Sequence, residues 1–175
     1  MNELLARIAE MEKPWVAAVN GPAVGGGGSL ALTCDLVLAA ESAYLSLGYV
    51  NIGMVLDMGS TFLLPRLVGL RKANELAFFG ERIYGPEAAE IGLVNRAVPD
   101  EDLMGAAREW AARLAAGPTL SIGAIKLGMR RALHGTFRDA MHWEAMMISL
   151  IAQTEDAAEG LSAFFQKREP VFRGK

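Results

Sequence analysis

Four consecutive glycines at positions 25–28 form the part of the chain best suited to bind a ligand through its backbone. A short apolar stretch, residues 16–19, precedes them, and a helix is expected to begin among them. Glycine has no Cβ, so an oxygen atom can closely approach the N–H groups of Gly25, Gly26 and Gly27. The first N–H groups of a helix lack internal partners and carry partial positive charge. The sequence therefore predicts a cradle for an anion, either a phosphate or a developing oxyanion.

The spacing around the glycines favours the oxyanion. There is no clean G-x-G-x-x-G pattern, no acidic residue at a strand end about 20 positions on, and no Lys-Ser or Lys-Thr pair of a phosphate-binding loop. Ser29 follows the glycines and could be a nucleophile, with His134 or His142 as its base. A small polar residue in the first turn of a helix is the commoner meaning of such a serine, and we favour it.

Asp57 is the second residue that could carry chemistry, and two interpretations are equally supported by its local sequence. It could be the N-cap of a helix that begins near Gly59. It could instead be a carboxylate in an apolar shell, acting as a proton shuttle. The apolar neighbours that suggest the second interpretation are Ile52, Met54, Val55, Leu56 and Met58.

Composition restricts the classes of protein to which this chain can belong. Of its 175 residues 52% are hydrophobic and its net charge is −3, which is typical of a globular protein and argues against non-specific nucleic-acid binding. The single cysteine, Cys34, cannot form an internal disulfide, and no spacing of metal ligands is visible. Residues 1–3 lack the features of a signal peptide, and no apolar run is long enough to cross a membrane. We therefore expect a cytoplasmic protein with neither a metal nor a membrane partner.

The elements that must position these residues fall into two parts. Residues 1–99 are expected to alternate short strands and helices, and residues 100–175 to be nearly all helical. The apolar runs predict strands and the 3.6-residue periodicity predicts helices. Strands are expected at 15–20, 35–40, 43–47 and 94–98. Helices are expected at 2–12, 30–34, 73–79 and 86–92, with another from about Gly59 and nearly continuous helix from Asp100. Pro65 is expected to kink a helix or to start a new one.

Several motifs together resemble the crotonase, or enoyl-CoA hydratase/isomerase, superfamily, and the likeness covers essentially the whole chain. They lie at residues 13–27, 34–40, 64–69, 80–83, 88–94 and 164–168. The resemblance implies an α/β fold, namely a ClpP-like ββα spiral core in residues 1–99. It also implies a C-terminal helical trimerisation region in residues 100–175.

The resemblance also implies a chemistry. The substrate would be an acyl-CoA thioester held as an enolate, with the Gly26 N–H as one oxyanion donor and no cofactor beyond the coenzyme A of the substrate. Ser29 and Tyr49 match the positions of the two glutamates that activate water in hydratases. Neither does acid–base work near neutral pH, since the ordinary pKa of tyrosine is about 10, so hydration is disfavoured.

The segment 53–59 resembles the catalytic segment of isomerases such as the ring-1,2-epoxyphenylacetyl-CoA isomerases. This likeness favours Asp57 as the base of an acyl-CoA double-bond isomerase in fatty-acid or aromatic-acid degradation. Leu56 stands where that segment has proline, and Ser60 where it has glycine. Tyr49 and Leu56 are expected to line the acyl pocket, and Lys167 matches a lysine that meets the phosphate end of coenzyme A.

Chains of this superfamily normally carry roughly another third of their length before the segment that begins here. The expectation is that the first strands, the second oxyanion N–H and much of the coenzyme A loop are absent. The chain could be a truncated product, or it could work with a second chain that supplies the absent parts. Two alternatives to the isomerase function are a catalytically silent fragment that serves as an assembly partner and a hydratase. The resemblance further implies a homotrimer or hexamer.

Overall fold

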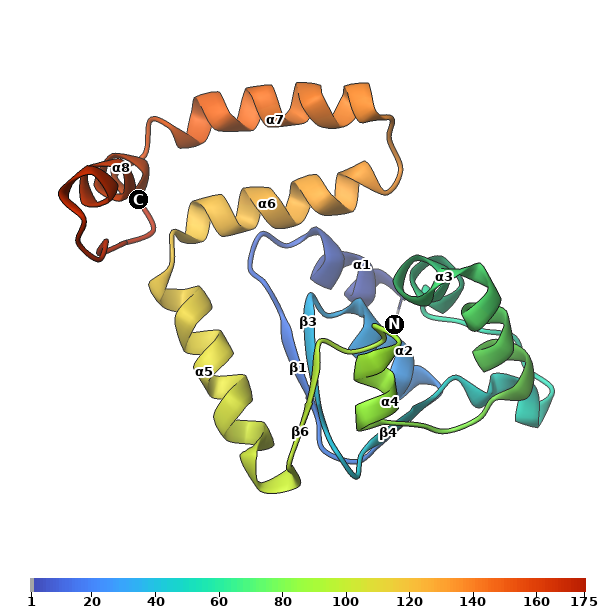
Figure 1. Cartoon of the computed structure of the whole chain (residues 1–175). Helices are drawn as coiled ribbons and strands as arrows, with labels where there is room; N and C mark the ends of the chain where they lie inside the picture. The colour runs from blue at the N-terminus through green and yellow to red at the C-terminus, as the bar shows by residue number, and fades with distance from the viewer. Residues whose placement is uncertain (1) are drawn as a thin grey trace. The chain divides into compact units, whose positions relative to one another are not determined.

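The computed structural model describes residues 2–175, which form two compact units. The first unit contains residues 2–9 and 15–109, and the second contains residues 10–14 and 110–175. The division falls within helix α5 (Leu103–Ala116), which is drawn in yellow in Figure 1.

A three-stranded parallel sheet forms part of the core of the first unit. Its order is β1 (Val16–Val19), β3 (Leu36–Ala40) and β6 (Arg96–Val98), with Val16 opposite Leu36 and Leu38 opposite Arg96. The central strand is a nearly unbroken apolar run because parallel strands are covered on both faces. The strands predicted from these apolar runs are confirmed, with ends shorter by a few residues.

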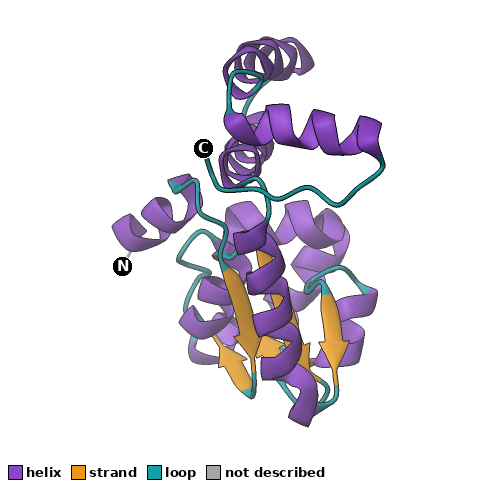
Figure 2. Cartoon of the chain, turned by 90° about the vertical axis from the view of Figure 1, so that its left-hand side faces the viewer, coloured by secondary structure: helices purple, strands orange, loops and turns teal. Residues whose placement is uncertain are grey.

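The second sheet, in the same unit, includes two strands that the sequence analysis did not predict. Strand β4 (Tyr44–Ser46) lies between the parallel β2 (Pro22–Val24) and the antiparallel β5 (Ile83–Tyr84). Both missed strands are only two or three residues long and adjoin glycine or proline, which are depleted in strands. Figure 2 shows the short strands in orange among the helices.

The helices of the first unit surround these strands. Helix α1 (Asn2–Glu10) buries Leu5 and Ile8, α2 (Gly26–Thr33) follows β2, and α4 (Gly85–Glu90) begins with the predicted proline in its first turn. A 3-10 turn, Asp100–Asp102, leads into α5.

The longest helix, α3 (Ser60–Phe79), corrects the prediction for Pro65. The helix continues through Pro65 and is broken at Gly69, whose φ of 77° and ψ of 156° are non-helical. Only glycine adopts this backbone conformation at low cost, so the kink falls where the side chain is absent. Leu64, on the helix, is fully buried in the core of the unit.

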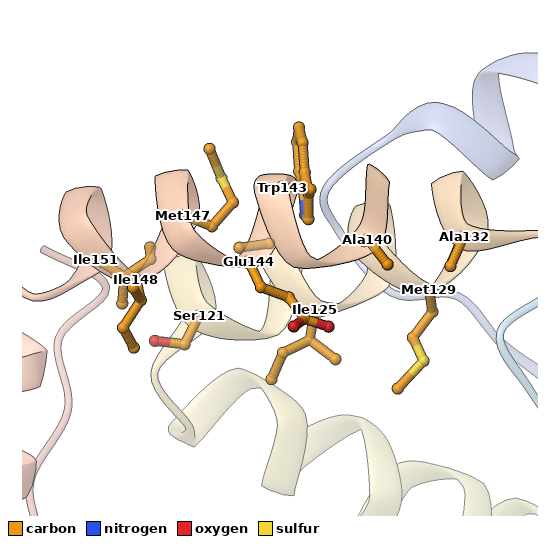
Figure 3. A pocket seen from close by; sticks show the side chains of 12 residues that line it. Ser121, Ile125, Met129, Ala132, Ala140, Trp143, Glu144, Met147, Ile148 and Ile151 are labelled. Carbon is orange, nitrogen blue, oxygen red and sulfur yellow. The ribbon is translucent and has the colours of Figure 1, made fainter. Parts of the chain in front are cut away.

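The second unit is built from helices. Helices α6 (Thr119–Ala132) and α7 (Phe137–Ile151) pack side by side, and Thr136 and Asp139 form a capping box at the start of α7. Between them lies an apolar groove with a volume of about 410 Å³, lined by side chains from both helices (Figure 3). Helix α8 (Glu155–Gln166) is capped by Thr154, whose side chain accepts a hydrogen bond from the Ala157 N–H.

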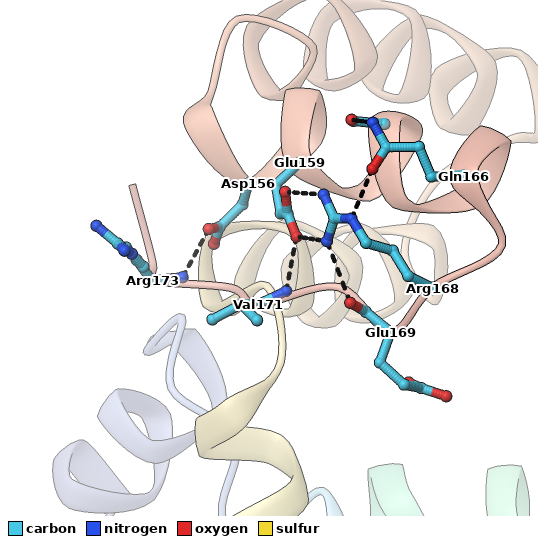
Figure 4. Close-up of polar contacts among 8 residues, drawn as sticks. Asp156, Glu159, Gln166, Arg168, Glu169, Val171 and Arg173 are labelled. Carbon is cyan, nitrogen blue, oxygen red and sulfur yellow. Dashed lines mark hydrogen bonds and ion pairs between the residues drawn. The ribbon is translucent and has the colours of Figure 1, made fainter.

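The C-terminal tail folds back onto α8 through two acidic side chains (Figure 4). Asp156 is buried and accepts hydrogen bonds from the backbone N–H groups of Arg173 and Gly174, at 2.7 and 2.8 Å. Glu159 receives both terminal nitrogens of Arg168, at 2.6 and 2.8 Å, and the Val171 N–H at 2.9 Å. The hydrogen bonds from Arg168 and Val171 lower the pKa of Glu159 to about 2.

This lowered pKa predicts a loss of stability in acid. A carboxylate whose folded pKa is depressed stabilises the fold above its unfolded value of 4.5, and the contribution is lost as the pH falls toward 2. Thermal unfolding of the wild type and of Glu159→Gln should therefore differ at pH 7 and converge near pH 2. A difference in melting temperature that stays constant over this range would contradict the assignment.

No helix within residues 2–175 is long and apolar enough to span a membrane.

Candidate active site

The glycine run places one free backbone donor at the start of α2. Gly25 has φ 54° and ψ −119°, which glycine adopts at low cost, and its N–H donates to the Ser46 carbonyl at 2.8 Å. This bond fixes Gly25 against β4. Gly26 is the first residue of the helix, and no acceptor within residues 2–175 pairs with its N–H. The predicted anion cradle therefore has a donor at Gly26, supported by the positive end of the helix dipole.

A tight turn at residues 57–60 brings Asp57 near the start of α2. The Ser60 N–H donates to the Asp57 carbonyl at 3.0 Å, and both central residues are left-handed, Met58 with φ 53° and Gly59 with φ 80°. A left-handed methionine is uncommon and costs of order 1–3 kcal/mol. The Met58 sulfur lies 3.0 Å from where a Cβ on Gly26 would stand. The turn therefore brings the residue after Asp57 directly against the helix start.

Three hydroxyl groups connect the interior to the Asp57 carboxylate. Ser60 and Ser29 are both fully buried, and their Oγ atoms lie 2.6 Å apart. Ser29 Oγ lies 3.0 Å from the hydroxyl of Tyr49, which is on the 3-10 turn Gly48–Ile52. The Tyr49 hydroxyl donates to Oδ1 of Asp57. Ser29 and Tyr49, which match the two glutamates of the hydratases, are thus neighbours in space. Their hydroxyl groups belong to one series of hydrogen bonds that ends at Asp57.

The number of available protons determines which hydroxyl group donates in each of these hydrogen bonds. Each hydroxyl has a single proton, and an ionised carboxylate can only accept. Since Tyr49 donates to Asp57, the hydrogen between Ser29 and Tyr49 comes from Ser29. The hydrogen between the two serines then comes from Ser60. Ser29 Oγ also lies 3.2 Å from the Gly25 carbonyl, so its proton is shared between two acceptors.

The environment of Tyr49 keeps its hydroxyl protonated. Burial is the largest cause that raises its pKa above the ordinary value, and the hydrogen bond and negative charge of Asp57 raise it further, while the hydrogen bond to Ser29 lowers it. Tyr49 is therefore a neutral donor at neutral pH.

The raised pKa gives a second prediction. The phenol stabilises the fold fully below its unfolded pKa of about 10, and this contribution is lost as the pH rises through the higher folded value. Absorbance titration of tyrosinate, compared with that of Tyr49→Phe, isolates the ionisation of Tyr49, whose pKa should lie above the ordinary value of about 10. In Asp57→Asn the same group should ionise at lower pH, and an unchanged titration would contradict the contact.

Two interpretations of Asp57 need correction. Asp57 is not the N-cap of α3, because Gly59 occupies that position and the Asp57 side chain bonds to Tyr49 instead. The predicted apolar shell is also wrong: Asp57 is exposed, and Ile52 and Val55 are 77% and 80% exposed. An irregular segment has no periodicity from which the direction of its side chains could be predicted.

The other predicted site residues have different surroundings. Gly27 is exposed in the first turn of α2, and Leu56 is half-buried beside Asp57. Ser29 is buried and its side-chain partners are oxygen atoms, which gives no support to a role as nucleophile. Lys167 belongs to the second unit, where it is an exposed, left-handed residue at the end of α8.

Ser60 and Met58 are site residues whose roles sequence reasoning missed. One feature of the sequence could have indicated the role of Ser60. Ser29 and Tyr49 stand where hydratases have glutamate, and Ser60 stands where the isomerase segment has glycine. Departures that occur together can be partners in space, and here the three are hydrogen-bonded to one another. No group of three or more potential metal-ligating side chains was found among residues 2–175.

Comparisons with known proteins identify the class of protein. The family model described as enoyl-CoA hydratase/isomerase matches residues 1–175. The chain is 38% identical over 174 residues to the 1,2-epoxyphenylacetyl-CoA isomerase of Escherichia coli K12, covering 99% of this chain and 66% of that one. It is 36% identical over 173 residues to the 2,3-dehydroadipyl-CoA hydratase of the same organism, covering 99% and 68%.

Solved structures agree with the sequence relatives. The crystal structure of an enoyl-CoA hydratase from Bacillus anthracis superposes with a TM-score of 0.95 at 34% identity, covering 99% of this chain and 67% of that one. The chain therefore belongs to the enoyl-CoA hydratase/isomerase family and has the crotonase fold. It spans about two thirds of the length of the relatives that it matches.

Proposed function

We propose that this chain is an acyl-CoA double-bond isomerase in which Asp57 is the base and the Gly26 N–H binds the thioester oxygen. The observation that supports the proposal is the chain of hydroxyl groups ending at Asp57. Ser29 and Tyr49 stand where hydratases of this family carry their two glutamates, and hydroxyl groups of this kind do not activate water near neutral pH. Asp57 is the carboxylate that hydrogen-bonds to this cluster within residues 2–175.

The proposed reaction needs one carboxylate and one anion donor. In a 3-enoyl-CoA the C2–H bond is acidified by the thioester, so Asp57 can remove that proton and leave an enolate. The negative charge develops on the thioester oxygen, where a preorganised N–H at a helix start stabilises it. The double bond moves from C3–C4 to C2–C3 as the proton returns to C4, which regenerates the carboxylate. No atom is added to the substrate or lost from it.

The substrate and its contacts are part of the same proposal. In this proposal Tyr49 and Leu56 would line the acyl site, and Lys167 would meet the phosphate end of coenzyme A. The similarity to a protein named 1,2-epoxyphenylacetyl-CoA isomerase supports an aromatic acyl group. Fatty-acid or aromatic-acid degradation is the proposed context, in the cytoplasm and with no cofactor beyond the substrate's coenzyme A.

The helical region suggests a second candidate role, in assembly. The groove between α6 and α7 is apolar, and Ile125, Met129 and Ile148 on these helices are 61–70% exposed. Exposed apolar patches of this kind commonly mark interfaces. We propose that residues 1–99 carry the chemistry and that residues 100–175 join copies into a trimer or hexamer. A silent subunit that pairs with another chain is the alternative.

Turnover by the purified chain distinguishes these roles. A panel of 3-enoyl-CoA thioesters, from short aliphatic to phenyl-substituted, is incubated with the chain alone, and the formation of 2-enoyl-CoA is followed. The isomerase proposal predicts conversion of at least one member without another protein. If no thioester is converted although the chain is folded and assembled, the isomerase proposal fails and the assembly role is favoured.

A further inference from the structure

We propose that Tyr49 is a positioning residue, whose hydroxyl fixes Oδ1 of Asp57 and leaves Oδ2 as the atom that takes and returns the substrate proton. The inference rests on the proposed function of Asp57. It adds a role for a residue that has replaced a glutamate of the hydratases, and it explains why that position holds a hydroxyl group.

The first step is that Asp57 needs a partner to fix it. The carboxylate is exposed and lies on a turn, so its side chain has no packed surroundings to define its orientation. Within residues 2–175, the hydrogen bond to its side chain comes from the Tyr49 hydroxyl. A general base acts efficiently only when it is within reach of the proton that it removes, so this bond determines the catalytic geometry.

The second step is that Tyr49 is itself fixed from behind. Ser29 is on α2 and Ser60 begins α3, and both side chains are fully buried. Ser29 supplies the proton that Tyr49 accepts, so the tyrosine's own proton is directed toward Asp57. A Cβ on Gly25 would stand 3.8 Å from the Tyr49 ring, which places the ring beside the helix start that carries Gly26.

The third step concerns the proton itself. With Oδ1 occupied by Tyr49, the C2 proton transfers to Oδ2 as the C2–H bond breaks, and its electron pair moves into the enolate. The proton then leaves Oδ2 to form the C4–H bond. Tyr49 keeps its proton throughout, and its raised pKa is consistent with this role.

The test uses Tyr49→Phe, which keeps the ring and removes the hydroxyl. We expect kcat for 3-enoyl-CoA isomerisation to fall about 10–100-fold, the usual effect of losing a hydrogen bond to a charged group, with KM changed less than about threefold. The matched control is Tyr84→Phe, because Tyr84 is half-exposed on β5 and its aromatic partner is Tyr44. Ser60→Ala, at the far end of the chain of hydroxyl groups, should lower kcat by a smaller factor.

A double mutant separates positioning from general damage to the fold. If Tyr49 acts through Asp57, Tyr49→Phe should cause no further loss in an Asp57→Asn background. Equal fold losses in both backgrounds, or an unchanged kcat in Tyr49→Phe, would overturn the inference while leaving Asp57 as the base. Full activity in Asp57→Asn would instead overturn the proposed function.

Discussion

Replacement of Asp57 by asparagine should lower the rate of 3-enoyl-CoA isomerisation about 10²–10⁴-fold, the range that general bases typically contribute. Asparagine has nearly the same size, and its amide oxygen can still accept the Tyr49 hydrogen bond, so the turn should persist. What it cannot do is accept the C2 proton. Steady-state kinetics with a 3-enoyl-CoA, together with binding of a saturated acyl-CoA, measure the two effects separately.

The binding measurement and a matched variant give this prediction its controls. Acyl-CoA affinity should survive in Asp57→Asn, since the Gly26 N–H is unchanged. Asp102 is another exposed aspartate, in the 3-10 turn before α5, and Asp102→Asn should isomerise at the wild-type rate. If Asp57→Asn isomerises as fast as the wild type, Asp57 is not the base.

Replacement of Gly26 by proline should lower kcat about 10²–10³-fold, the usual effect of losing one oxyanion donor. Proline is well tolerated at the first position of a helix, where its missing N–H leaves no helical hydrogen bond unmade. The substitution therefore removes the proposed donor while the helix is retained. Kinetics on the same thioester, with circular dichroism to verify the fold, provide the measurement.

The added atoms of proline need a separate control, since a Cβ on Gly26 would approach the Met58 sulfur to 3.0 Å. Gly26→Ala introduces the same contact but keeps the N–H. The flexible methionine side chain can move aside, so Gly26→Ala should lose much less activity than Gly26→Pro. Equal losses in the two variants would assign the effect to the Met58 contact and remove Gly26 from the oxyanion hole.

The regular core was predictable because its strands are continuous apolar runs. Residues 36–40 are apolar and all but Leu36 are buried, and the helix starting among the glycines follows from their position after a strand. Strand β2 was missed because Pro22 and its glycine neighbours are turn residues by local preference. The break in α3 was expected at Pro65, but it falls at Gly69, where the absence of a side chain permits a φ of 77° at low cost.

The candidate site was predictable in its residue types but not in its contacts. Asp57, Tyr49 and Ser29 were each identified, yet the hydrogen bonds that join them depend on a turn with left-handed Met58, which the sequence does not indicate. In the sequence, Ser60 is notable only because it stands where the isomerase segment has glycine. Its role became visible when the fold placed it 2.6 Å from Ser29.

The most direct test of proton transfer by Asp57 is product analysis in water enriched in oxygen-18. The purified chain is incubated with 3-enoyl-CoA and, separately, with 2-enoyl-CoA, and the products are analysed by mass spectrometry. Proton transfer by Asp57 predicts that 3-enoyl-CoA gives 2-enoyl-CoA with no oxygen-18 incorporated. Labelled 3-hydroxyacyl-CoA as the main product from either substrate would show that the chain adds water, and would contradict the isomerase proposal.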